Sequence, residues 1–137
     1  MYKNILVAVE PTHAEKHEEA LKLALHLAED INSEVTALTV IEPLPNYLDP
    51  SETNRKHETR AGEAALAALR KFVGPLSEIR TLVLHGSAGP EILKYAKEKR
   101  VDCVVIASHK PGLSDYFLGS TAARVVRHAS CGVHVLR

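Results

Sequence analysis

The stretch Ile5-Leu6-Val7-Ala8-Val9 places five apolar residues in a row near the start of the chain. A strand with one solvated face alternates apolar and polar residues, whereas an unbroken apolar run is typical of a parallel strand covered on both faces. Glu10-Pro11-Thr12 ends this run. From about Ala14 to Ile31, apolar residues recur at spacings of three and four, which predicts a helix. The first unit is therefore a buried strand followed by a helix.

The same unit recurs along the chain. Further strands are predicted at residues 35–41, 80–85, 101–107 and 133–136, and further helices at 52–73, 91–100 and 120–129. We expect the 52–73 helix to bury Ala61, Ala64, Ala65, Ala68, Leu69 and Phe72. Alternating strands and helices favour an α/β fold, a three-layer sandwich with a five-stranded parallel sheet, about four helices and right-handed crossovers.

Composition bounds the class of protein. With 137 residues, of which 45% are hydrophobic and 25% charged, the chain is expected to form one soluble domain spanning residues 1–137. Lys plus Arg and Asp plus Glu each number 17, so no net charge draws the chain to nucleic acid or an anionic membrane. Apolar runs such as Cys103–Ala107 are far shorter than the roughly 18 residues of a membrane helix. No signal-peptide pattern precedes the first strand and two cysteines make no disulfide framework, so we expect a cytoplasmic location.

A doubly wound sheet binds ligands beyond the carboxyl ends of its strands, where the strand order reverses. This rule directs attention to the loops after Val9, Val40 and Ala107. The last of these returns at Gly119 to open a helix, whose first amides and positive dipole end favour an anion. Together with Lys110 they predict a phosphate site, although an ordinary N-cap role for Ser120 explains that residue equally well.

Several segments resemble the universal stress protein family. They are residues 1–9, the turn 85–90, the loop 107–121, the stretch 124–129 and the closing 132–137, and residues 118–129 are the most specific part. The resemblance spans the whole chain. It implies an adenine-nucleotide-hydrolase-like fold with a five-stranded parallel sheet, and usually a homodimer. Many members bind ATP through a Gly-x2-Gly-x9-Gly-Ser/Thr loop, and another branch lacks this loop and binds no nucleotide.

The loop departs from that pattern at its start. Ala107 and Lys110 stand where the two glycines belong and the loop is one residue shorter, whereas Gly119-Ser120 is kept. The form Ser108-His109-Lys110-Pro111 resembles a short-loop branch that ends Leu-Gly-Ser. The resemblance thus implies ATP or a related adenine nucleotide, alone or with Mg²⁺, with Glu10 near the ribose and Val40 near the adenine. The implied binding residues are Ala8, Val9, Glu10, Val40, Ile106, Ala107, Ser108, His109, Lys110, Gly119, Ser120 and Thr121.

The predicted function is binding in a stress response rather than fast catalysis. No residue is an evident base for attack on a phosphoryl group and no Walker-type Lys-Ser/Thr pair is present, so ATP turnover should be slow or absent. The terminal strand with Val133, Val135 and Leu136 is expected at a sheet edge, where the resemblance implies a twofold dimer contact. The alternative is a nucleotide-free homodimeric adaptor. An FMN-binding or phospho-acceptor module is weaker, because no second carboxylate lies beside Glu10 in the sequence.

Other reactive residues are assigned no role. His13 and His17 are one helical turn apart, but without a third ligand they are expected to be solvated. Ser108 beside His109 is not interpreted as a hydrolase site because the Gly-x-Ser-x-Gly elbow is missing. Cys103 is expected to be a buried small hydrophobe in its strand.

Overall fold

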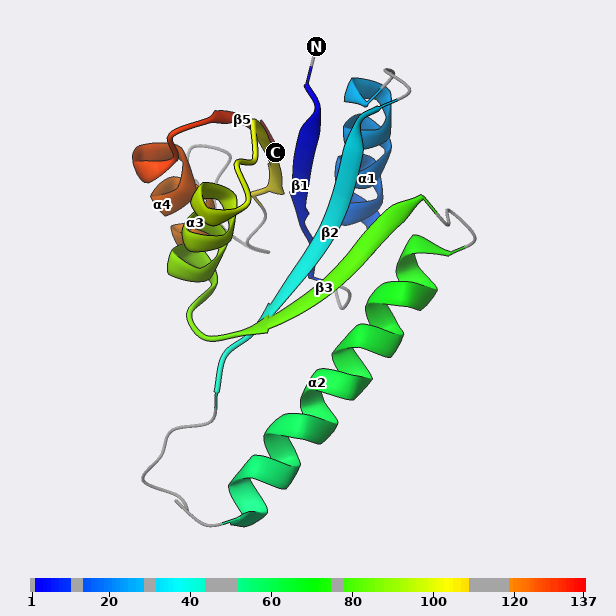
Figure 1. The fold of residues 1–137 in the computed structure, drawn as a ribbon, viewed down its shortest axis with the longest axis vertical. Helices are drawn as coiled ribbons and strands as arrows, with labels where there is room; N and C mark the ends of the chain where they lie inside the picture. The colour runs from blue at the N-terminus through cyan, green and yellow to red at the C-terminus, as the bar shows by residue number, and fades with distance from the viewer. Residues whose placement is uncertain (1, 11–13, 29–31, 44–51, 75–77, 109–118) are drawn as a thin grey trace.

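The computed structural model describes residues 2–10, 14–28, 32–43, 52–74, 78–108 and 119–137. In chain order the elements are β1 (Asn4–Ala8), α1 (Ala14–Leu27), β2 (Glu34–Ile41), α2 (Glu52–Val73), β3 (Ile79–His85), α3 (Ala88–Glu98), β4 (Cys103–Ala107), α4 (Ser120–His128) and β5 (Gly132–Leu136). The strands form one sheet in the order β3-β2-β1-β4-β5, and all four neighbouring pairs are parallel (Figure 1). The predicted α/β sandwich is confirmed.

The helices cover the two faces of the sheet in pairs. Helices α1 and α2 pack on one face through Ala20, Leu21, Ala24, Leu69 and Val73, and α3 and α4 pack on the other through Ile92, Ala96, Ala122 and Val125. In β1, Ile5 and Val7 face the first pair, whereas Leu6 and Ala8 face the second. The apolar run that opens the chain is unbroken because the central strand buries both of its faces.

The amino end of β1 is fixed by side-chain hydrogen bonds. The carboxylate of Asp102 accepts hydrogen bonds from the backbone N–H groups of Lys3 (2.9 Å) and Asn4 (3.1 Å). The Asn4 side-chain amide in turn donates to the carbonyl of Lys99 at 2.8 Å. These contacts join β1 to the segment that leads into β4, its neighbour in the sheet.

Some element boundaries differ from the prediction. Helix α1 ends at Leu27 rather than Ile31, and residues 29–31 lie outside the described residues. Helix α3 begins at Ala88, three residues early, because Gly86 turns the chain at a φ of 144° and Ser87 then takes the N-cap. Strand β4 begins at Cys103, two residues later than the apolar pattern indicated.

Helix α2 was predicted with the right bounds and the wrong inner face. Leu69 and Phe72 pack against the core as expected, but Ala61, Ala64 and Ala68 are exposed. The beginning of α2 extends beyond the end of the sheet (Figure 1), but further along the helix a different side faces β3. Thr59, Gly62 and Leu66 of α2 line a hollow against β3, and Leu69 and Val73 continue that side into the core. Small apolar side chains at helical spacing therefore did not mark a buried face here.

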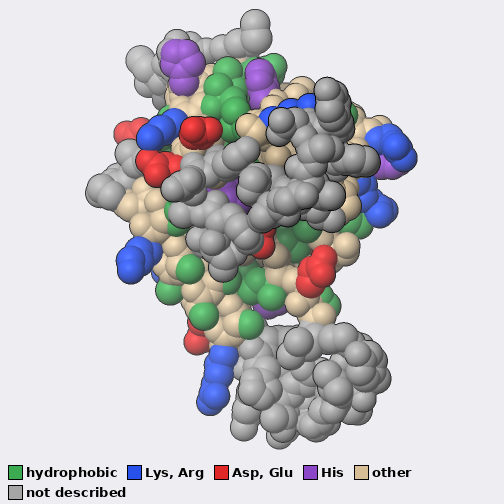
Figure 2. All heavy atoms as spheres, turned by 180° about the vertical axis from the view of Figure 1, so that it is seen from behind, with side chains coloured by type: hydrophobic (Ala, Val, Ile, Leu, Met, Phe, Trp, Pro, Cys, Tyr) green, Lys and Arg blue, Asp and Glu red, His purple; other side chains and the backbone are tan. Residues whose placement is uncertain are grey.

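The surface carries both signs of charge. On the face shown in Figure 2, acidic and basic side chains are interspersed, and no field of one sign dominates the described surface there. No described helix combines the length and the hydropathy that crossing a bilayer requires.

Candidate functional site

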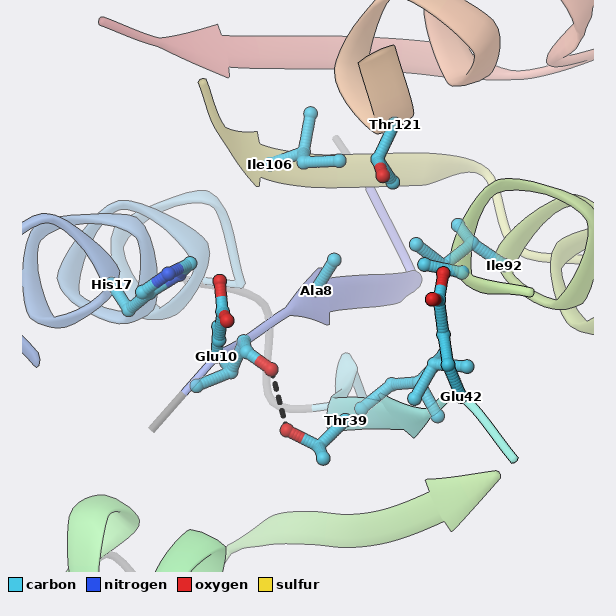
Figure 3. Close-up of a pocket in the computed structure, with 12 residues that line it drawn as sticks. Ala8, Glu10, His17, Thr39, Glu42, Ile92, Ile106 and Thr121 are labelled. Atoms are coloured by element: carbon cyan, nitrogen blue, oxygen red, sulfur yellow. Dashed lines mark hydrogen bonds between the residues drawn. The ribbon is translucent and has the colours of Figure 1, made fainter. Parts of the chain in front are cut away.

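The strand order reverses at β1, because the chain runs outward through β2 and β3 and then returns to add β4 and β5 on the other side. A cavity of about 430 Å³ lies at the carboxyl ends of these central strands (Figure 3). Its lining is Ala8, Val9, Glu10, His17, Leu38, Thr39, Val40, Glu42, Ala88, Ile92, Ile106 and Thr121. The cavity thus occupies the place where a sheet of this topology binds ligands.

The floor of the cavity is apolar and held by hydrogen bonds between β1 and β2. Ala8, Val9 and Ile106 are buried beneath it. The Val9 N–H donates to the carbonyl of Leu38 at 2.8 Å, and the hydroxyl of buried Thr39 donates to the carbonyl of Val9 (Figure 3). These two bonds fix the backbone just before Glu10, so the direction in which Glu10 leaves the sheet is set by β2.

Three helices begin at the cavity. His17 lies in the first turn of α1, Ala88 is the first residue of α3, and Thr121 is the second residue of α4. Neither of the N-caps of α3 and α4, Ser87 and Gly119, makes a side-chain capping hydrogen bond. The first amides of a helix have no intrahelical partner and lie at the positive end of its dipole. The backbone amides at these helix starts therefore favour an anion.

The start of α4 is tied to the end of β4 by Ser108. The Gly119 N–H donates to Ser108 Oγ at 2.8 Å, and the Ser108 N–H donates to the carbonyl of Leu136 at 2.7 Å. Gly119, not Ser120, is the N-cap, which corrects the alternative considered for Ser120. The first intrahelical donor is Ala123, whose N–H bonds the Gly119 carbonyl at 2.9 Å. The backbone N–H groups of residues 120–122 come before Ala123 and therefore have no carbonyl partner within the helix.

Gly119 has room around it on the protein side. A Cβ added there would meet only Ser108 Oγ, at an ordinary contact distance of 3.8 Å, among the described atoms. Its φ of −55° is open to any residue. Neither described packing nor backbone conformation therefore requires a glycine at this position.

Six of the twelve predicted site residues line the cavity: Ala8, Val9, Glu10, Val40, Ile106 and Thr121. Ala107, Ser108, Gly119 and Ser120 adjoin these in the chain at the end of β4 and the start of α4, outside the lining. His109 and Lys110 lie outside the described residues.

Six further residues of the cavity lining were not predicted from the sequence: His17, Leu38, Thr39, Glu42, Ala88 and Ile92. Among them, His17 also contradicts the prediction made for it. His17 is buried, with 9% of its surface exposed, rather than solvated. Its imidazole points toward the carboxylate of Glu10 (Figure 3). Glu42 extends into the cavity from the end of β2. The available signal for both was position: Glu42 directly follows β2, and His17 lies in the first turn of the helix that follows β1.

The charge of the described lining is acidic. It contains two carboxylates, Glu10 and Glu42, and neither Lys nor Arg. Within the described residues, no group of three His, Cys, Asp or Glu side chains could hold a metal ion. The thiols are at the opposite end of the sheet, since Cys103 opens β4 and burial raises its pKa to about 11. Burial likewise raises the pKa of Cys131, so neither thiol is activated.

The model of the Universal stress protein family matches residues 1–137. The chain belongs to this family. It is 31% identical over its full length to a universal stress protein of Methanothermobacter thermautotrophicus, of which it covers 97%. It is also 31% identical to universal stress protein G of Escherichia coli O157:H7, with both chains fully covered. Among solved structures, the universal stress protein UspA from Lactobacillus plantarum has 27% identity and a TM-score of 0.72 over 99% of this chain and 98% of that one.

Two structural relatives of this universal stress protein were solved with adenine nucleotides. One is a universal stress protein in complex with cAMP, at 19% identity and a TM-score of 0.71 over 99% of this chain and 97% of that one. The other is the universal stress protein from Archaeoglobus fulgidus in complex with dAMP, at 21% identity and a TM-score of 0.62 over 99% and 98%. At such identities the likeness to these two proteins shows the fold alone.

Proposed function

We propose that this universal stress protein binds ATP or a related adenine nucleotide in the cavity at the carboxyl edge of the sheet. The observation that carries the proposal is the meeting of three helix N-termini at an apolar-floored cavity where the strand order reverses. Helix N-termini favour phosphate, and an apolar floor with a few polar groups suits a nucleoside. The cAMP and dAMP complexes of relatives with this fold support the same class of ligand.

In this proposal the adenine lies near Val40, the ribose near Glu10 and the phosphates over the start of α4. Ser120 and Thr121 supply amides and hydroxyls there. The proposal also assigns phosphate contacts to Ala107, Ser108, His109 and Lys110, and the charge of Lys110 or of a bound Mg²⁺ would offset the acidic lining. Gly119 leaves open space, which supports close approach of a phosphate.

The protein is proposed to act by binding in a cytoplasmic stress response, with slow ATP turnover at most. The single domain spans residues 1–137 in this proposal. It is also proposed to form a homodimer through β5, the terminal strand at one edge of the sheet. Val133, Val135 and Leu136 are only half-buried there, and pairing with a second copy would cover them and satisfy the open edge.

The test is a thermal-shift titration with saturating ATP, with and without Mg²⁺. A ligand at 100 times its dissociation constant stabilises a protein by about 2.7 kcal/mol, which is a rise of about 9 °C for a chain of this length. Gly119→Asp should abolish the rise, because its carboxylate would lie at the proposed phosphate position. Both Asp and Asn are good N-caps, so Gly119→Asn is the matched control that keeps the fold and omits the charge.

An unchanged melting temperature for the natural protein, with magnesium present, would exclude nucleotide binding. The homodimeric adaptor would then be the better interpretation, and sedimentation of β5 variants would test it. Release of adenine nucleotide when the purified protein is denatured is a second, independent measurement.

A further inference from the structure

His17 is a buried titratable side chain that the proposed function does not yet use. It belongs to the first turn of α1 and lines the cavity, with 9% of its surface exposed. Figure 3 shows its ring directed at the carboxylate of Glu10, which comes from the end of β1. The other acidic residue of the lining, Glu42, comes from the end of β2 on the far side of the cavity (Figure 3).

Glu10 and His17 differ in exposure and in the number of side-chain bonds that can rotate. Glu10 is exposed and hangs on a side chain with three rotatable bonds, so ordering its carboxylate for a ligand costs conformational entropy. His17 has two rotatable bonds and is held by a helix that packs on the core through Ala20, Leu21 and Ala24. A group held in the core next to a longer, exposed side chain limits the orientations of its carboxylate before the ligand arrives, which improves affinity.

We propose that His17 is a positioning residue, which holds the Glu10 carboxylate as a hydrogen-bond acceptor for a ribose hydroxyl. The consequence is selectivity: the cavity favours nucleotides with free ribose hydroxyls over deoxynucleotides. This inference rests on the proposed adenine nucleotide site. A hydroxyl donating to a carboxylate makes a charge-assisted hydrogen bond, and a deoxynucleotide cannot form that bond. The discrimination is therefore expected to be about tenfold.

The experiment measures dissociation constants by calorimetry for AMP, 2′-deoxy-AMP and 3′-deoxy-AMP. The readout is the dissociation constant of a deoxynucleotide divided by the dissociation constant of AMP. Of the 2′-deoxy and 3′-deoxy ratios, the larger one is compared between variants. His17→Leu keeps an apolar body and removes the polar ring edge, so the ratio should fall from about tenfold to about twofold. His17→Gln retains an N–H donor and should keep most of the ratio.

Two further variants complete the design. Glu10→Gln should lower the ratio as His17→Leu does, and the double variant should lower it no further, because both act through one carboxylate. His26→Gln is the matched control, since His26 lies on the exposed face of the same helix. Its ratio should equal that of the natural protein.

The outcomes separate this inference from the function on which it rests. If His17→Leu weakens AMP and the deoxynucleotides equally, the ring only packs, and the inference is wrong while nucleotide binding stands. If the natural protein binds AMP and both deoxynucleotides equally, Glu10 selects no hydroxyl, and the inference is again wrong. If none of these nucleotides nor ATP binds, the proposed function fails, and this inference fails with it.

Discussion

The hydrogen bond from Thr39 to the carbonyl of Val9 gives a direct test of how the cavity floor is held. Thr39 is buried, with 6% of its surface exposed, and Val9 is buried as well. Thr39→Val keeps the shape of the side chain and removes the donor. The Val9 carbonyl then lacks this partner away from water, which costs about 1–2 kcal/mol after the small gain from the added methyl.

That magnitude converts to a measurable shift. At about 2.1 cal/mol/K per residue, the unfolding entropy of 137 residues turns about 1.5 kcal/mol into a fall of about 5 °C in Tm. Urea unfolding should show a lower midpoint with an unchanged m-value, because the surface exposed on unfolding stays the same. Nucleotide affinity should also fall, since the backbone that carries Glu10 loses one of its two ties to β2.

The control is Thr36→Val on the same strand. Thr36 is equally buried, with 5% exposed, and its side chain makes no hydrogen bond to any other described residue. This substitution should leave stability unchanged or raise it. If the two variants unfold at the same urea concentration, the Thr39 hydroxyl does not hold the cavity floor, and the reasoning is refuted.

Three further predictions concern positions elsewhere in the fold. Gly86→Ala should destabilise the protein by about 1–3 kcal/mol, because φ is 144° and the new Cβ would lie 2.8 Å from Glu91 Cγ. Gly74→Ala, at a φ of 66° with only an ordinary contact to the Lys71 carbonyl oxygen at 4.0 Å, should cost less in the same urea titration. Asp102→Ala should lower the free energy of unfolding by about 1–2 kcal/mol, because it removes the acceptor of two backbone N–H groups. Asp102→Asn keeps one acceptor oxygen and should lose less; an equal loss would contradict this cause. For Cys103 the raised pKa means that the folded state holds the thiol proton more tightly. Stability should therefore be full below about pH 9 and decline as pH rises toward 11, and Cys103→Ala should show a flatter decline in that window.

Much of the architecture followed from periodicity. The run from Ile5 to Val9 predicted a strand buried on both faces, and it is the central strand of the sheet. The loops after Val9, Val40 and Ala107 were singled out as candidate ligand-binding segments, and residues from the ends of all three preceding strands line or adjoin one cavity. Prediction succeeded there because the carboxyl ends of parallel strands must meet at one edge.

Prediction failed where a residue's surroundings come from another element. The alanines of α2 have helical spacing, but the side of α2 that packs is set by its contact with β3, which Thr59, Gly62 and Leu66 meet instead. Gly119 rather than Ser120 caps α4 because Ser108, eleven residues earlier, accepts its N–H. Such facts depend on distances between elements, which local sequence does not encode.

The sequence by itself determined the alternation of strands and helices and the burial of the central strand, because each depends on local pattern. With a general rule of topology, it also predicted the edge of the sheet at which the ligand site is proposed. Only the tertiary structure decided that His17 is buried and faces Glu10. A histidine near the start of an amphipathic helix is compatible with water or with a cavity wall, and the choice depends on how α1 rotates as it packs on the sheet. That rotation is set by the core side chains of both partners together, so it exists only in the folded molecule.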